Sequence, residues 1–241
     1  MGKHHYDALP RAARAPLDAL VKALRGILED KLRSVIVHGS AARGDYRAGI
    51  SDLDVVVVIA EPTRAVLERI ADPIALARAS GRVETMLLTE EQIDRASDVF
   101  PLYYEDIQKC HAVVYGTDPF ESLIIAPENR RLRIEQELRE ARIRLRRAVV
   151  DGRGDERALG RAVSRKLRQV RFPLRALLEL VGVECESHAL DIVVEKACRK
   201  FGVESSSLRR VEAKPEAAYD ALSMLLGRAI DVVDHLGEPA P

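Results

Sequence analysis

The chain has 241 residues, of which 47% are hydrophobic and 32% charged, and its 38 basic side chains balance its 38 acidic ones. The length fits one large domain or two small ones, and the composition predicts a globular protein with a substantial core. A net charge of zero gives no reason to expect a nucleic-acid or membrane partner. Three widely spaced cysteines, no apolar run of about 18 residues and no signal-peptide pattern favour reduced thiols and a cytoplasmic location.

Up to residue 126 the sequence alternates between helical and strand patterns. Apolar spacing and short β-branched runs predict, in chain order, helix 14–31, strand 34–39, strand 51–60, helix 61–80 with a break near Pro73, strand 81–89 and a short helix 90–96. The segments 101–107 and 111–116 are predicted to be further strands or extended chain. Strand 51–60 is apolar on both faces beyond Asp54, which is typical of a strand in the middle of a covered sheet.

From Arg130 onward the apolar residues follow a helical period, with a stripe at Ile134, Leu138, Ala141, Leu145 and Val149. The breaks in this pattern predict helices 128–150, 155–181 with a kink or break at Pro173, 187–201 and 214–236. The sequence therefore predicts an α+β first half followed by a helical second half.

Two aspartates stand at the start of the apolar strand 51–60. Residues i and i+2 of a strand point to the same face, so Asp52 and Asp54 project together while Leu53 points the other way. Two neighbouring carboxylates repel each other and resist desolvation, and a divalent cation such as Mg²⁺ removes both problems. The spacing predicts a metal site. The alternative is that Asp52 caps the preceding turn and Asp54 lies at a sheet edge.

The residues that end the preceding strand are suited to binding an anion. Gly39 lets the backbone approach a ligand closely, and backbone N–H groups at a turn, with the Ser40 hydroxyl, can bind phosphate. Arg43 lies three residues on and could reach the same phosphates, or it could be a plain surface arginine. His38 is predicted to be a core histidine rather than a catalytic one.

Glu84 is the candidate for a third carboxylate. It lies in strand 81–89 on the face opposite Val83 and Thr85, and adjacent strands are about 4.8 Å apart, so it could point at the aspartate pair. It would serve as a third metal ligand or as the base for an acceptor hydroxyl. Alternatively it faces solvent on an edge strand, and Glu105 or Asp106 is the third acid.

The segment 130–175 holds 16 basic and 6 acidic residues, a surplus of ten positive charges. The favoured interpretation is a solvated helix face with i,i+4 ion pairs such as Glu135–Arg139 and Glu140–Arg144. The alternative is that arginines of this segment meet a triphosphate or an RNA backbone, with Arg165, Lys166 and Arg168 as the ones to test.

The stretch "VHGSAARGDYRAGISDLDVVVV", followed by "RVETMLL", resembles the DNA polymerase β-like nucleotidyltransferase superfamily over about residues 33–90. The layout is also similar to that of the aminoglycoside adenylyltransferases. The resemblance implies an α+β fold with a mixed sheet flanked by helices over 1–126, the nucleotidyltransferase domain, and a helical bundle over 127–241 that selects the acceptor. It further implies that Gly39 and Ser40 hold the triphosphate, that Asp52 and Asp54 bind Mg²⁺, and that Glu84 is the third carboxylate. That family more often has Asp at the third position.

The sequence and the resemblance together predict a Mg²⁺-dependent nucleotidyltransferase with two metal ions and ATP or another nucleoside triphosphate as co-substrate. It would move a nucleoside monophosphate, AMP from ATP in the favoured form, to a hydroxyl of a small-molecule acceptor and release pyrophosphate. The first alternative is a catalytically silent, nucleotide-binding regulatory module. The second is an RNA-directed nucleotidyltransferase, ranked lower because four Phe, six Tyr and no Trp offer few stacking platforms.

Overall fold

The computed structural model describes residues 6–185 and 187–236, and the chain forms two compact units, Met1–Ile125 and Ala126–Pro241. None of the described helices combines the length and the apolar composition that crossing a bilayer requires.

A four-stranded mixed sheet forms the centre of the first unit, in the order β3-β2-β1-β4. Its strands are β1 (Leu32–His38), β2 (Leu53–Ile59), β3 (Val83–Leu88) and β4 (Ala112–Gly116). Strand β1 runs antiparallel to β2 and β4, whereas β2 and β3 are parallel. Strand β2 is an interior strand, as its run of valines predicts, because apolar residues on both faces need cover on both sides.

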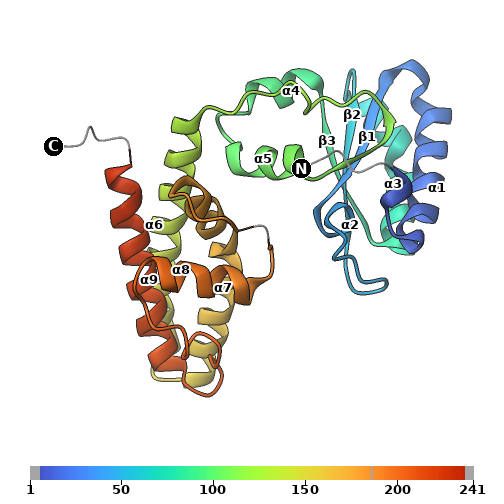
Figure 1. Ribbon diagram of the computed structural model, residues 1–241. Coiled ribbons are helices and arrows are strands. Elements are labelled where there is room, and N and C mark those ends of the chain that lie inside the picture. The colour runs from blue at the N-terminus through green and yellow to red at the C-terminus, as the bar shows by residue number, and fades with distance from the viewer. Residues whose placement is uncertain (1–5, 186, 237–241) are drawn as a thin grey trace. The chain divides into compact units, whose positions relative to one another are not determined.

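Helices cover both faces of this sheet (Figure 1). They are α1 (Arg11–Leu28), α2 (Gly39–Arg43), α3 (Arg64–Gly81), α4 (Glu90–Arg95) and α5 (Pro101–Lys109), with short 3-10 turns at Tyr6–Ala8 and Glu29–Lys31. On one face Val35 and Val55 pack against the leucines of α1 and against α3. On the other face Ile36 and Val56 pack with Ile107 of α5 and with Ile93 of α4. The alternating directions of neighbouring strand residues thus supply two separate cores.

Two predictions for this unit are wrong. Helix α3 is continuous through Pro73, although a break was expected there. Ile70 and Ala77 are buried on either side of the proline, and this packing outweighs the backbone hydrogen bond that proline removes. Segment 101–107 is helix α5 rather than extended chain. Pro101 occupies the first helical turn, where its missing N–H costs nothing, and Leu102 and Ile107 turn into the core.

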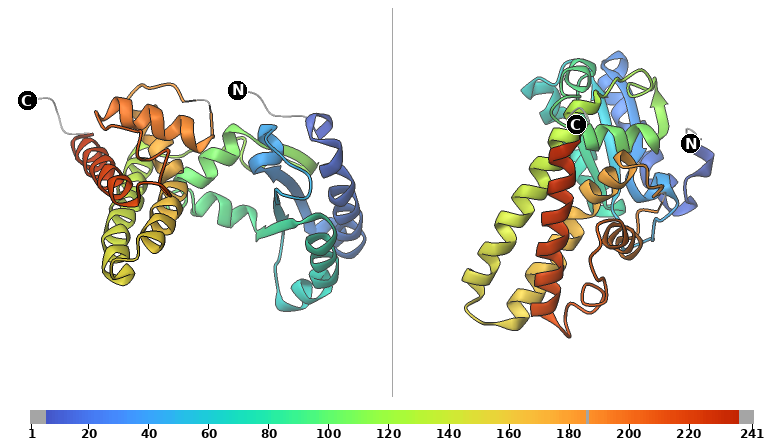
Figure 2. Two further views of the ribbon diagram at one scale, coloured as in Figure 1. Left: turned by 90° about the horizontal axis from the view of Figure 1, so that it is seen from below. Right: turned by 60° about the vertical axis from the view of Figure 1, so that its left-hand side comes forward.

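The second unit is a helical bundle, seen from two further sides in Figure 2. It consists of α6 (Pro127–Gly152), α7 (Glu156–Leu180), α8 (Leu190–Lys200) and α9 (Pro215–His235). Helix α7 packs against each of the other three helices, and it runs through Pro173 without a break. The predicted stripe on α6 is buried from Ile134 to Leu145, whereas Val149 is 43% exposed. The predicted α+β fold with a mixed sheet and a C-terminal helical bundle is confirmed.

Candidate active site

The aspartate pair stands at the start of the interior strand. Asp54 is the second residue of β2, half-buried, and it lies opposite His38 of β1 in the strand register. Asp52 comes just before β2 and its side chain is 49% exposed. Leu53, between them, is fully buried in the core on the opposite face. The alternation of the strand therefore directs both carboxylates away from that core.

Glu84 lies beside Asp54. The parallel register of β2 and β3 pairs the two residues directly, and neighbouring strands are about 4.8 Å apart. Burial raises the pKa of the Asp54 carboxyl; Arg43 lowers it, and the negative charges of Asp52, Glu84 and Asp106 raise it further. Asp54 is thus the centre of a group of four carboxylates, and β3 is an edge strand on which Glu84 is exposed.

Arginines neutralise the three outer members of this group. Nη2 of Arg82 lies 2.8 Å from Oδ1 of Asp52, and Nη2 of Arg78 lies 2.7 Å from Oε2 of Glu84. Both arginines come from the C-terminal end of α3. These pairs are largely exposed, and exposed pairs contribute little to stability.

The remaining pair is less accessible to water. Nη1 of Arg43 donates to Oδ2 of Asp106 over 3.0 Å, with both side chains less than one-fifth exposed. This bond ties α2 to α5. Arg43, predicted as a phosphate ligand, is therefore held by an acid in this structure, and Asp106 rather than Glu105 is the acid of α5 that acts on Asp54. Glu105 pairs with Lys109 at 2.9 Å.

The Gly39–Ser40 turn is built against Asp54. Gly39 has a φ of 68°, in the left-handed region, and a β-carbon there would overlap Oδ2 of the Asp54 carboxylate. Only glycine meets both demands without strain. Gly39 and Ser40 are the first two residues of the short helix α2, so the predicted turn and the predicted acid are immediate neighbours.

The buried His38, which precedes this turn, contacts the partly buried Tyr103 of α5. Oη of Tyr103 and Nε2 of His38 lie 3.2 Å apart, and the two rings meet edge to face. Burial, followed by the charges of Arg43 and His111, lowers the pKa of His38 to about 4. Burial and then the charge of Asp54 raise the pKa of Tyr103 to about 12. A neutral imidazole and a protonated phenol therefore border the acids at physiological pH.

Carboxylate oxygens are the ligands that a hard cation such as Mg²⁺ prefers, but these side chains do not form a complete set of metal ligands in this structure. Within the described residues, no three His, Cys, Asp or Glu side chains are gathered so as to hold one metal ion. Asp52 and Asp54 nevertheless supply the one or two carboxylates that Mg²⁺ takes together with phosphate oxygens. The pKa of Asp54 is raised first by burial and then by the negative charges of its acidic neighbours, and a bound cation would offset both costs of the ionised carboxylate.

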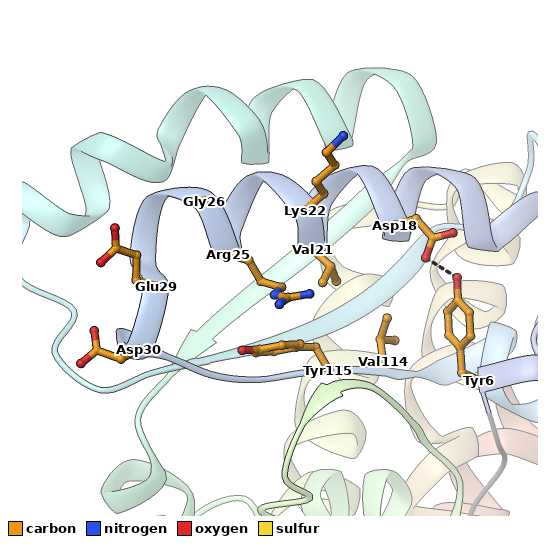
Figure 3. A pocket seen from close by; sticks show the side chains of 10 residues that line it. All are labelled: Tyr6, Asp18, Val21, Lys22, Arg25, Gly26, Glu29, Asp30, Val114 and Tyr115. Atoms are coloured by element: carbon orange, nitrogen blue, oxygen red, sulfur yellow. Dashed lines mark hydrogen bonds between the residues drawn. The ribbon is translucent and has the colours of Figure 1, made fainter.

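A separate hollow of about 650 Å³ lies between α1 and β4, away from these acids (Figure 3). The guanidinium of Arg25 stacks over the ring of Tyr115 at 5.0 Å, and Tyr6 donates a hydrogen bond to Asp18. None of the predicted site residues lines this hollow. The candidate active site is therefore identified by its charges and backbone geometry rather than by the shape of the surface.

The basic segment 130–175 divides between two helices with different surroundings. On α6 the predicted i,i+4 pairs are present: Arg139 lies 2.8 Å from Glu135, and Arg144 pairs with Glu140. Lys166 of α7 is buried, and its Nζ donates to Oε1 of Gln169 over 2.7 Å. Its neighbours Arg165 and Arg168 are exposed, so these three residues do not share one surface.

Comparison with known proteins places most of the first unit in a described protein family. Residues 20–114 match the family model described as "Nucleotidyltransferase domain", a span that includes Gly39, Ser40, Arg43, Asp52, Asp54 and Glu84. The resemblance drawn from the sequence is thereby confirmed, and with it the class of enzyme, a nucleotidyltransferase. No curated protein matches the sequence.

Among solved structures, the crystal structure of the spectinomycin adenyltransferase AAD(9) from Enterococcus faecialis with ATP and spectinomycin is similar to this chain. The TM-score is 0.55 at 14% sequence identity, over 92% of this chain and 99% of that one. At this identity the likeness establishes a shared fold. It bears out the predicted layout of a sheet domain followed by helices.

Proposed function

We propose that this chain, which carries a nucleotidyltransferase domain, transfers AMP from ATP to a hydroxyl group of a small-molecule acceptor and releases pyrophosphate. The acceptor oxygen forms a bond to the α-phosphorus, and the bond to the bridging oxygen of the pyrophosphate breaks. The observation that carries this proposal is the contact between the Gly39 turn and the half-buried Asp54, with Asp52 and Glu84 beside it.

In this proposal Asp52 and Asp54 hold Mg²⁺, two ions in the full complex. The chemistry that the bound metal supplies is neutralisation of phosphate charge and alignment of the attacking and leaving oxygens. Asp52 would be available to the cation because its ion pair with Arg82 is half-exposed and therefore weak. Asp54 needs no such exchange, since no cationic side chain among the described residues forms an ion pair with it.

The Gly39–Ser40 turn receives the triphosphate through its backbone and the Ser40 hydroxyl. Arg43 joins it by exchanging the carboxylate of Asp106 for a phosphate oxygen, a charge-assisted bond of similar geometry. Glu84, held by Arg78 in this structure, takes the proton of the acceptor hydroxyl or completes the metal site.

The acceptor is proposed to be selected by residues 127–241 and to be a small molecule. AAD(9), a structure of the same fold, contains ATP and spectinomycin, and this supports both the choice of ATP and the class of acceptor. We place the reaction in the cytoplasm, where ATP is available and free thiols such as Cys110 persist.

The test is a pyrophosphate-release assay with ATP, MgCl₂ and a panel of aminocyclitol and aminoglycoside acceptors, with mass spectrometry of the products. We expect acceptor-dependent release and a product heavier by one AMP moiety. Asp54→Asn should lower the rate about 100-fold or more, whereas Asp30→Asn, in the hollow of Figure 3, should not. Calorimetric titration of ATP separates the alternatives: binding that ignores Asp54 and metal, without release, would point to a regulatory module.

A further inference from the structure

A row of arginines lies on one face of α7, within the helical bundle. Arg157, Arg161, Arg165 and Arg168 are all exposed and follow one another at intervals of four, four and three residues. Such spacing keeps side chains on one face of a helix. At about 1.5 Å per residue the row is about 16 Å long. We refer to these four residues as the α7 arginine row.

The α7 arginine row lines a groove of about 860 Å³. Its opposite wall is formed by Glu212 and by Pro215, the first residue of α9; Pro215 and the backbone carbonyl of Val211 lie within van der Waals distance of the position that a β-carbon on Gly160 would take. Two acids, Glu156 and Glu212, also line it, so its lining carries a net charge of two positive units. The groove is therefore a positively charged channel along the helix.

The ion pairs of the two basic helices differ sharply. On α6, Arg131, Arg133, Arg139, Arg144 and Arg147 each pair with an acid four residues away. Within the described part of the chain, no side chain forms an ion pair or hydrogen bond with a guanidinium of the α7 arginine row. The interpretation as a solvated face of i,i+4 pairs thus holds on α6 and does not extend to this row.

The row also opposes the stability of its own helix. Arg157 and Arg161, and Arg161 and Arg165, stand at i,i+4, where like charges repel. Asp155, the N-cap of α7, forms no ion pair with the row: its pKa is lowered first by the backbone N–H of Ala158 and then by that of Arg157, and the charges of Arg161 and Arg157 come after these hydrogen bonds. Arginines that repel one another and lack acidic partners are suited to an anion supplied from outside.

The length of the groove and the residues that line it limit the kinds of anion that it can bind. A row of about 16 Å is longer than one triphosphate, so the anion is extended. None of the nine described residues that line the groove is aromatic, so unpaired bases find no platform for stacking. Guanidinium groups pair well with phosphate oxygens, and base-paired nucleic acids are bound largely through the phosphate backbone.

We propose that the α7 arginine row binds the phosphate backbone of a base-paired nucleic acid. This site goes beyond the proposed transfer reaction and does not depend on it, because all of its residues lie in the second unit and binding is measured without turnover. Neutral overall charge does not oppose the idea, since segment 130–175 alone carries a surplus of ten positive charges.

The test is fluorescence anisotropy of the full chain with a labelled RNA duplex of roughly 20 base pairs, between about 50 and 200 mM KCl. Four phosphate contacts predict a slope of about −3.6 for log K against log [KCl]. The double variant Arg161→Gln/Arg165→Gln should weaken binding about tenfold or more at low salt and reduce the slope by about 1.8.

The matched control is Arg144→Gln/Arg147→Gln, which removes the same charge from α6 but from residues that already have acidic partners. It should leave binding close to that of the wild type. Equal losses in the two double variants would overturn the proposal, as would no binding of the duplex at the lowest salt. A circular dichroism melt of Arg161→Gln/Arg165→Gln should show no loss of stability, because the substitution relieves repulsion.

Two further ligands, a single strand and inorganic polyphosphate, test whether the bound phosphates belong to a base-paired nucleic acid. The single strand of the same sequence should bind more weakly than the duplex, since the groove offers no stacking surface. Tighter binding of the single strand would contradict the base-paired class. Inorganic polyphosphate that binds through Arg161 and Arg165 while the duplex does not would likewise refute a nucleic-acid ligand.

Discussion

Gly39 and Asp54 are in direct contact: the space that a β-carbon would occupy on Gly39 is filled by Oδ2 of the Asp54 carboxylate. The two residues come from α2 and β2, on either side of a connection of nine residues, 44–52. The turn after β1 and the start of β2 are therefore packed together, with the backbone of Gly39 against the carboxylate of Asp54.

Gly39→Ala should destabilise the protein and abolish nucleotide transfer. The alanine must adopt a φ of 68° and displace Asp54, at a cost of about 1–3 kcal/mol for the backbone strain alone. Differential scanning fluorimetry and the pyrophosphate assay measure the two effects.

Gly49→Ala is the control, because Gly49 has a φ of 76° with open space around it. It shares the backbone strain without the collision. If both variants lost stability and activity equally, contact with Asp54 would not be the reason for glycine at position 39.

Asp54→Asn should raise the melting temperature at pH 7 while removing activity. Burial raises the pKa of Asp54 in the folded state, so the ionised carboxylate costs stability once the pH exceeds its value in the unfolded chain. The amide removes that charge, and we expect a gain of about 2 °C or more.

The gain should shrink as the pH falls toward the ordinary range of an aspartate, where the wild-type carboxyl also becomes neutral. Melting curves of both proteins from pH 7 downward test this. A difference in melting temperature that stays constant with pH would contradict a charge-based origin.

His38 should make the protein acid-sensitive. Its pKa is about 4 when folded, below the ordinary value of 6.5, so the unfolded state binds the extra proton between these values. Stability that is present above pH 6.5 is therefore lost as the pH falls toward 4. We expect His38→Gln to flatten this part of the pH–stability curve, as measured by urea unfolding.

Arg82→Gln should strengthen Mg²⁺ binding, because the cation no longer competes with the guanidinium for Asp52. The pair is half-exposed, so the gain should be no more than about fivefold. Calorimetry with MgCl₂ in the presence of a non-hydrolysable ATP analogue measures it. Arg69→Gln, which removes a charge bonded to the backbone carbonyl of Ile27, serves as the control. Weaker metal binding in Arg82→Gln alone would mean that Arg82 supports the site instead.

The sheet and the placement of the acids could be predicted from sequence because they rest on local pattern. Alternation fixes the face of Asp54, and the β-branched runs mark β1 and β2 as strands. The pairing of Asp54 with Glu84 follows once β3 is placed beside β2.

The arginine partners and Tyr103 could not be predicted in the same way. Arg78 and Arg82 reach the acids because α3 continues through Pro73 and Arg82 takes a left-handed backbone conformation at its end. Tyr103 reaches His38 only because segment 101–107 is helical. The two tyrosines at 103 and 104 suggest a strand, and the signal that could have corrected this is Pro101, a typical first residue of a helix.

Asp54 and Glu84 occupy different positions in the sheet, and this difference affects which of them can change when the enzyme evolves toward new acceptors. Asp54 lies on a strand that is paired on both sides, so its place is set by three backbones, whereas Glu84 lies on the outermost strand. A library of variants selected for transfer to new acceptors should therefore accumulate changes at Glu84 and its neighbours, and almost none at Asp54. Under the proposed mechanism, the interior strand would hold the acid of the step common to all substrates, and the edge strand would be the place where new specificities arise.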